Sequence, residues 1–183
     1  MEVYKIKPDV NQFQSFLPVD DAIWKTDVLK FDGNSKLQTW QPPPVYVLYP
    51  KKALGNFFRI SAGAFAFDSA ADEMIRGVCE MAGELLPLPY KGETYFVLNV
   101  LECIDCLDGD SSKWTLTAGG DRIGVAKYMF YKNRFSESSI FKIPETARGE
   151  LLTVSGRDED VEFKSIVERA GLKGILFEKV WQS

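Results

Sequence analysis

The sequence contains no histidine, and this absence excludes several kinds of functional site. A Ser-His-Asp triad, a Cys-His dyad, a histidine-bound zinc ion and a histidine pH switch all need that side chain. The glycine-rich motifs GxGxxG and GxxxxGK[ST], which bind phosphate groups, are also absent, as is the GxSxG motif of serine hydrolases. The chain therefore lacks the common sequence signs of a nucleophilic or phosphate-binding enzyme.

Cysteines and long apolar runs are scarce. The three cysteines, Cys79, Cys103 and Cys106, leave one unpaired under any disulfide scheme, which favours a reducing compartment. The longest nearly apolar runs, such as Tyr95 to Leu101, are far shorter than the ~20 residues that cross a bilayer. The first residues lack the apolar stretch of a secretory signal. We expect a soluble cytoplasmic protein with no membrane partner.

The charge balance is mildly acidic. The 183 residues include 22 Lys and Arg against 26 Asp and Glu, which gives a net charge of -4. Such a chain has no long-range attraction for a phosphate backbone, so we expect no nucleic-acid partner. A chain of this length forms a core large enough to fold without a disulfide or a metal. We expect a globular protein without cofactors.

The first 44 residues differ in pattern from the rest. A short strand is possible from Val3 to Ile6, but the aromatic residues that follow have no sustained period. Three prolines, Pro42 to Pro44, then impose an extended backbone. We predict that residues 1–44 form an N-terminal extension packing on the core, and that residues 45–183 form an α+β domain.

Two helices and several strands are predicted from residue 45 onward. Asp68 or Ser69 caps the first helix and Gly83 ends it, and apolar residues recur at helical spacing between them (Ala71, Met74, Ile75, Val78 and Ala82). The second helix is predicted from Glu159 to Ala170. Strands are predicted over residues 45–49, 57–60, 93–101, 114–117, 122–131, 140–143, 151–154 and 174–181. This pattern is typical of an α+β fold with a mainly antiparallel sheet of roughly eight strands, residues 93–101 being central, and two principal helices.

Two groups of residues resemble chemical sites. Cys103 and Cys106 form a CxxC motif, but zinc needs four ligands and a redox motif needs a helix N-terminus, so we predict a structural role. The acidic residues Glu102, Asp105, Asp108 and Asp110 could bind a metal or serve as acid and base, or they could simply cap a turn. The spacing does not match a helical calcium loop. We therefore expect no metal site and no catalytic residue.

A second acidic group spans Arg157 to Glu162. We interpret it as the first turn of the second helix, where the helix dipole favours negative charge. It also forms a negative patch that could attract a basic partner.

The order of several short motifs is similar to that of a known family. The motifs span Glu84–Leu88, Gly92–Tyr95, Leu98–Val100, Asp105–Asp108, Ile140–Pro144 and Ala170–Trp181. In this order they resemble the immunity proteins of bacterial polymorphic toxin systems, typified by a Myxococcus protein and long catalogued as a domain of unknown function. The resemblance extends from Val45 to Trp181, about three quarters of the chain.

The resemblance implies a cytoplasmic protein that binds a cognate toxin domain and blocks it, with no enzymatic activity and no cofactor. We predict that the partner-binding residues are the acidic ones: Glu102, Asp105, Asp108, Asp110, Asp158, Glu159 and Asp160. Two alternatives remain open from the sequence. One is a non-catalytic adaptor or scaffold domain, and the other is a histidine-free hydrolase that uses the carboxylates near Asp105. The oligomeric state stays open as well.

Overall fold

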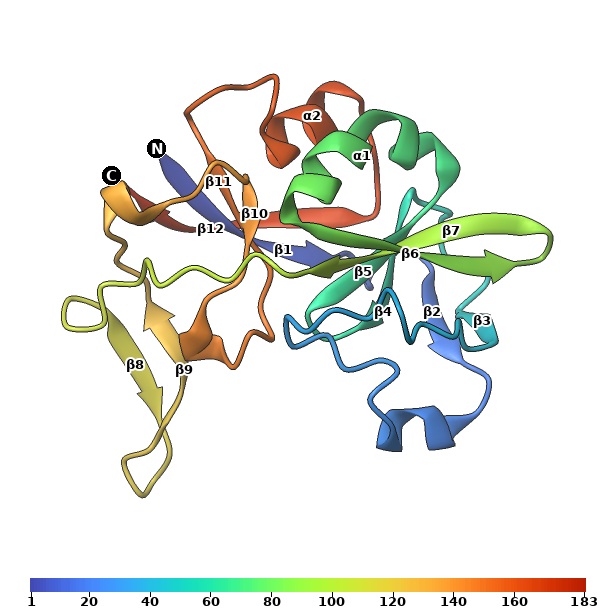
Figure 1. Ribbon diagram of the computed structural model, residues 1–183, viewed down its shortest axis with the longest axis horizontal. Helices are drawn as coiled ribbons and strands as arrows, with labels where there is room; N and C mark the ends of the chain where they lie inside the picture. Colours follow the sequence, from blue (N-terminus) through green and yellow to red (C-terminus); the bar gives the residue numbers. More distant parts are fainter.

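A computed structural model describes every residue from Met1 to Ser183. It contains two α-helices and twelve strands in three sheets, in which almost all neighbouring strands are antiparallel (Figure 1). The predicted α+β class with two principal helices is thereby confirmed. The strands are more numerous than the roughly eight predicted, and they form three sheets instead of one.

The largest sheet has six strands in the order β3-β2-β4-β5-β7-β6. Only β2 and β4 are parallel. Its strands are β2 (Ser15–Pro18), β3 (Val45–Leu48), β4 (Phe57–Ser61), β5 (Ala64–Phe67), β6 (Gly83–Tyr90) and β7 (Glu93–Val100). The predicted strand at 93–101 is therefore β7, which pairs with β5 on one side and with β6 on the other.

The second sheet has four antiparallel strands in the order β10-β11-β1-β12. They are β10 (Ile140–Phe141), β11 (Leu152–Ser155), β1 (Glu2–Pro8) and β12 (Ile175–Gln182). The third sheet is the hairpin of β8 (Lys113–Leu116) and β9 (Arg122–Lys127), which projects from the molecule (Figure 1). Three short 3-10 helices, η1 (Asp21–Lys25), η2 (Lys132–Arg134) and η3 (Pro144–Thr146), lie in the connections.

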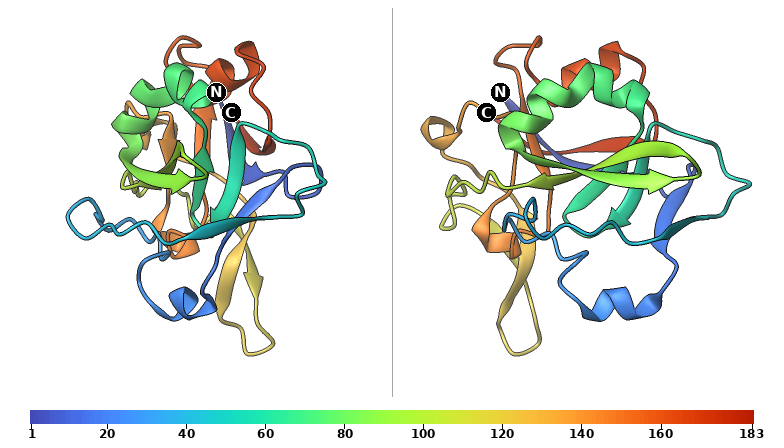
Figure 2. Two further views of the ribbon diagram at one scale, coloured as in Figure 1. Left: turned by 90° about the vertical axis from the view of Figure 1, so that its right-hand side faces the viewer. Right: turned by 45° about the vertical axis from the view of Figure 1, so that its right-hand side comes forward.

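Both helices lie on the same side of the two large sheets (Figure 2). Helix α1 (Ser69–Ala82) begins as predicted, because the Asp68 side chain accepts a hydrogen bond of 2.8 Å from the N–H of Ala71. Gly83 ends it. Of the predicted apolar stripe, Met74 is exposed and the other four residues are buried. No helix, α1 included, is long and apolar enough to cross a membrane.

The core consists of three hydrophobic clusters. One lies between the helices and both large sheets and includes Phe57, Phe65 and Phe163. The second covers the opposite face of the four-stranded sheet, and the third covers the opposite face of the six-stranded sheet. Each large sheet is therefore covered on both faces. Phe31, which lies in the long connection between β2 and β3, belongs to the third cluster.

Three strands, β2, β5 and β6, were not predicted. Strand β6 contains Pro87 and Pro89, which weaken a strand pattern. It is the edge strand of its sheet and pairs only with β7. A proline on the outer side of an edge strand has no neighbouring strand to which an N–H would donate, so no hydrogen bond of the sheet is lost. The other two are four residues long and have little period of their own. In contrast, the predicted strand at 122–131 ends early, at Lys127.

Residues 1–44 supply strands to both large sheets. Strand β1 lies between β11 and β12, and β2 lies between β3 and β4. The two ends of the chain meet, since the N–H of Ser183 donates to the carbonyl of Met1 at 3.1 Å. The division of the chain at residue 44 stays a prediction.

Candidate functional site

The first acidic group forms a folded turn, here called the Asp108 turn (residues 102–112). The Asp108 side chain accepts a hydrogen bond of 3.1 Å from the N–H of Ser111, and the Asp108 carbonyl accepts one from Ser112. Hydrogen bonds from the hydroxyl and the N–H of Ser111 hold the pKa of Asp108 below its usual value. The carboxylate is therefore ionised at neutral pH and fixed in direction, as in an Asp-capped turn.

The other acidic residues of the Asp108 turn have different surroundings. Asp105 is exposed and forms an ion pair with Arg134 at 3.5 Å. Asp110 is exposed, and the Glu102 side chain is partly buried. The carbonyl of Glu102 accepts a hydrogen bond of 2.8 Å from the N–H of Lys142, which fixes the start of the turn beside β10.

The CxxC motif lies in the same segment, and its two thiols have different surroundings. Cys103 is partly buried, Cys106 is fully buried, and neither forms a disulfide. Burial raises the pKa of the Cys106 thiol to about 12, so it is not a thiolate at neutral pH. No group of three or more Cys, Asp or Glu side chains is placed to hold a metal ion.

The second acidic group is also a turn, here called the Glu162 turn (residues 156–162). The prediction that it forms the first helical turn is wrong, because α2 (Phe163–Arg169) begins only after Glu162. The reason is the Glu162 side chain, which is buried inside the turn. Its carboxylate accepts hydrogen bonds from the N–H groups of Gly156 (3.1 Å), Arg157 (2.5 Å) and Asp158 (3.0 Å).

These hydrogen bonds determine the charge of Glu162. Burial acts to raise the pKa of Glu162, but the N–H groups of Arg157, Gly156 and Asp158 outweigh it, and the pKa lies below its usual value. Asp158, Glu159 and Asp160 precede Glu162 in the chain, and all three are exposed. Asp160 forms an ion pair with Arg169 of α2 at 2.9 Å.

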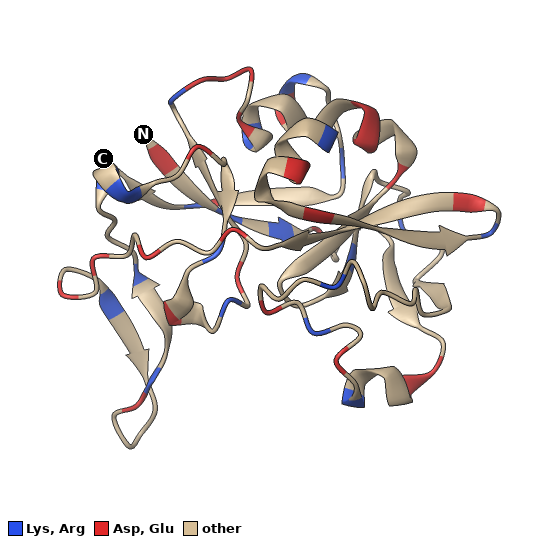
Figure 3. Cartoon of the chain, in the orientation of Figure 1, with Lys and Arg blue, Asp and Glu red and all other residues tan.

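One segment, residues 132–138, contacts both turns. Arg134 pairs with Asp105 of the Asp108 turn. The Arg157 guanidinium of the Glu162 turn donates to the carbonyls of Ser136 (2.5 Å) and Ser138 (3.3 Å). In Figure 3 the two turns lie in the half of the molecule that carries the chain termini, the Glu162 turn above the termini beside α2 and the Asp108 turn below them beside the β8–β9 hairpin. The structure therefore places the predicted residues in two separate groups, which are connected through residues 132–138.

The structure also contains a polar feature that the sequence did not reveal. Lys142 is 0% exposed, forms no ion pair, and donates from Nζ to the carbonyl of Phe31 at 2.6 Å. A second attachment lies nearby, where the buried Asn99 amide donates to the carbonyl of Asn34 (2.9 Å) and to Glu84 (3.0 Å). A lysine within the apolar run Ile140–Ile143 was the one available sign.

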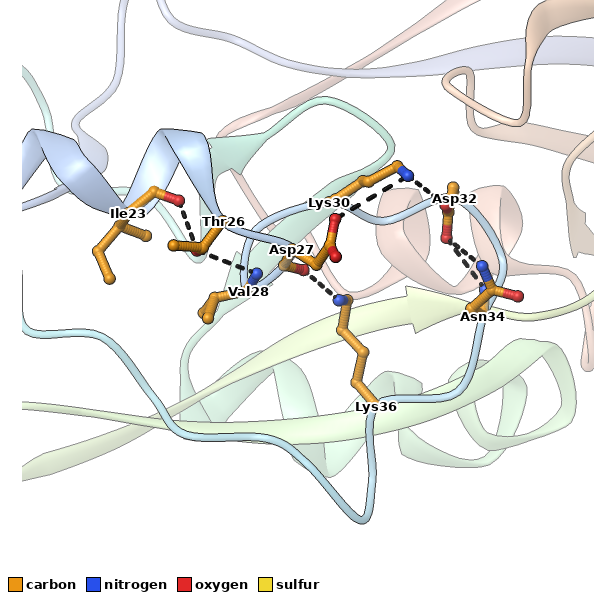
Figure 4. Close-up of polar contacts among 8 residues, drawn as sticks. All are labelled: Ile23, Thr26, Asp27, Val28, Lys30, Asp32, Asn34 and Lys36. Atoms are coloured by element: carbon orange, nitrogen blue, oxygen red, sulfur yellow. Dashed lines mark hydrogen bonds and ion pairs between the residues drawn. The ribbon is translucent and has the colours of Figure 1, made fainter.

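These contacts hold a long connection, here called the 23–36 loop, against the rest of the protein. Figure 4 shows the polar contacts within this loop. Within it, Lys30 pairs with Asp32 at 3.2 Å, and Lys36 donates to the carbonyl of Asp27 at 2.5 Å. Thr26 donates to the carbonyl of Ile23 at 2.7 Å. The loop is therefore folded by its own polar contacts as well as by its attachments.

The fold and these surfaces define an α+β protein that presents two rigid, ionised turns. A model of the Immunity protein family (Imm11) matches residues 88–182, which is more than half of the chain. The chain belongs to this family, so the resemblance predicted from the sequence is confirmed, although the match begins at residue 88 and not at the expected Val45. No curated protein matches the chain.

The family match covers all seven predicted acidic residues, and Lys142 and Asn99 also lie within it. The 23–36 loop lies outside it. The hydrogen bonds from Lys142 to Phe31 and from Asn99 to Asn34 therefore connect the matched part of the chain to the part that precedes it. Family membership indicates a function in immunity.

Proposed function

We propose that this protein binds the toxic domain of a cognate bacterial toxin in the cytoplasm and blocks it by occupying its surface. The observation that carries the proposal is the family match over residues 88–182. In this role the protein is not an enzyme and needs no cofactor. A binding inhibitor needs a rigid scaffold and a complementary surface, and no nucleophile or general base.

We further propose that the toxin contacts the Asp108 and Glu162 turns. Several observations support this surface. Asp158, Glu159 and Asp160 of the Glu162 turn are exposed, and hydrogen bonds within each turn fix its backbone. Charged groups at the rim of an interface mainly raise the association rate and select the partner. A toxin that acts on nucleic acid needs a basic cleft, which such a surface complements.

A rescue assay tests the function. The toxic C-terminal domain encoded beside this gene is expressed with and without the protein, and the survivors are counted. The proposal predicts survival together with a complex that co-purifies. Survival without a complex would indicate an enzyme that repairs the damage, and no survival would favour the adaptor hypothesis.

A charge-reversal variant tests the surface. We expect Asp158→Lys, Glu159→Lys and Asp160→Lys together to weaken toxin binding ~10-fold or more at low salt and to flatten its salt dependence. The matched control reverses three exposed acidic residues elsewhere that form no ion pair: Asp21, Glu73 and Glu93. It changes the net charge equally. Equal weakening by both variants would show that only net charge matters, and would contradict the proposed surface.

A further inference from the structure

A cleft of the molecule lies where the two large sheets meet. It has a volume of about 390 Å³ and is bordered by β1, by the turn between β4 and β5, and by the segment Gly149–Leu151. None of its lining residues belongs to the Asp108 or Glu162 turn. We call it the Arg59 cleft. Small-molecule sites are commonly clefts of this size at the junction of two structural units.

The Arg59 cleft is lined by three cations and one carboxylate. Lys5 pairs with the carboxylate, Glu150, at 2.9 Å, and Lys7 pairs with Glu178 outside the lining. Arg59 forms no ion pair and no side-chain hydrogen bond, and its cross-strand neighbours are Phe65 and Ser15. Because both lysines are paired with carboxylates, Arg59 supplies the uncompensated positive charge of the cleft, in a protein whose net charge is -4. An unpaired guanidinium in a cleft favours a bound anion.

The wall of the cleft adds a fourth cation. Gly63 lines the cleft in a left-handed conformation (φ 70°), and a Cβ there would lie 2.8 Å from the carbonyl of Phe31 and 3.2 Å from Nζ of Lys142. The buried Lys142 ammonium thus lies directly behind the wall. Field from a buried charge is screened little by solvent, so Lys142 adds to the positive potential.

A strained segment leads into the same cleft. Ala147 (φ 50°) and Arg148 (φ 57°) are consecutive non-glycine residues in the left-handed region, directly before the lining residue Gly149. Such conformations persist where the surrounding structure imposes them, and they are frequent beside ligand sites. Here they place the carbonyl of Arg148 against Gly63.

We propose that the Arg59 cleft binds a small organic dianion, either a phosphate monoester or a dicarboxylate. Arg59 binds the anionic group with two of its three guanidinium nitrogens, and Lys7 supports it. Apolar lining residues such as Ile6, Val10 and Leu151 contact the organic part. This site goes beyond the proposed toxin-binding function and does not depend on it.

Calorimetric titration of the full-length protein with phenyl phosphate and, separately, with succinate tests the proposal. We expect saturable binding of at least one of them at constant ionic strength. Which one binds identifies the source of the negative charge. Arg59→Gln removes the unpaired guanidinium from an exposed position, and we expect it to weaken binding ~10-fold or more. The matched control, Arg122→Gln, removes an exposed arginine from the β8–β9 hairpin and leaves the affinity within about twofold of wild type.

Lys7→Gln provides a second variant, which we expect to weaken binding less than Arg59→Gln does. Circular dichroism and the unfolding midpoint verify that each variant folds. No saturable binding of either ligand by the wild-type protein would overturn the proposal. Equal weakening by Arg59→Gln and Arg122→Gln would also overturn it, because binding would then reflect general charge.

Discussion

Two loops of this protein are each held by one buried charged side chain, and the two charges are satisfied very differently. In the Glu162 turn, a carboxylate accepts three backbone N–H groups, and its ionised form is favoured. At the 23–36 loop, the Lys142 ammonium has one carbonyl partner, and burial lowers the pKa of Lys142 to about 8. Both side chains are closed to solvent, but Lys142 lies deeper in the protein, so stronger desolvation and fewer partners together disfavour its charge.

The difference explains what each side chain contributes to folding. Three backbone N–H groups and the hydroxyl of Ser165 donate to Glu162 and leave it little unsatisfied capacity, so the turn and the carboxylate stabilise each other. Lys142 has three N–H groups and donates one of them, so hydrogen bonding offsets only part of the free-energy cost of removing its charge from water. The nearby Asp32 carboxylate acts to raise the pKa of Lys142, but less than burial lowers it. We conclude that Glu162 builds its turn, whereas Lys142 only positions the 23–36 loop.

The largest effect is expected from Glu162→Ala. The change leaves three N–H groups without their acceptor and should lower the free energy of unfolding by about 3 kcal/mol. Glu159→Ala, on the exposed face of the same turn, should change it by less than about 0.5 kcal/mol. Urea unfolding of both variants measures the difference, and similar values would show that water replaces the carboxylate.

The same residue predicts an acid dependence. The pKa of Glu162 is lower in the folded protein than the ordinary value of 4.5, so its stabilisation is fully present above pH 4.5. It is lost as the pH falls through the folded-state pKa. We therefore expect wild type and Glu162→Ala to converge in stability below that range. If the difference in unfolding free energy between the two proteins stayed constant down to acid unfolding, the ionised form of Glu162 would not be what stabilises the turn.

A smaller effect is expected from Gly63→Ala, which tests the close approach at the 23–36 loop. A Cβ at Gly63 would meet the carbonyl that Lys142 binds, in addition to the cost of its positive φ. We expect a loss of about 2 kcal/mol in unfolding free energy. Gly92 also has a positive φ (85°), but a Cβ added there would have no atom within 4 Å. Gly92→Ala should therefore lower the free energy of unfolding by only about 1 kcal/mol. Equal losses would mean that only the backbone conformation matters.

The smallest effect is expected from Lys142→Met. It removes a poorly satisfied charge but leaves the Phe31 carbonyl unpaired, so the net change should stay within about 1 kcal/mol. The pKa of Lys142 lies below the ordinary 10.5, so the unfolded chain binds more protons between pH 8 and 10.5. Wild-type stability therefore gains relative to Lys142→Met as the pH rises through this window. If the unfolding free energies of wild type and Lys142→Met changed in parallel from pH 7 to 10, the inference that burial lowers the pKa of Lys142 would be contradicted.

Elements with local signals were predictable from the sequence, and those that depend on distant partners were not. Helix α1 follows from Asp68, its apolar spacing and Gly83, all within one segment. Strand β6 depends on its place at a sheet edge, which the prolines obscured. Lys142 and Phe31 are 111 positions apart, so no pattern links them. The acidic run before α2 was wrongly predicted to be helical. The sequence does not show that Glu162 is buried, because tertiary contacts set its position.

Amide hydrogen exchange of the protein, alone and bound to its toxin domain, tests most directly the claim that the two rigid acidic turns form the toxin-binding surface. We expect slower exchange in residues 105–112 and 156–162 on binding, with little change in the β8–β9 hairpin or in residues 19–41. Protection confined to the hairpin or to residues 19–41, with both turns unchanged, would contradict this claim.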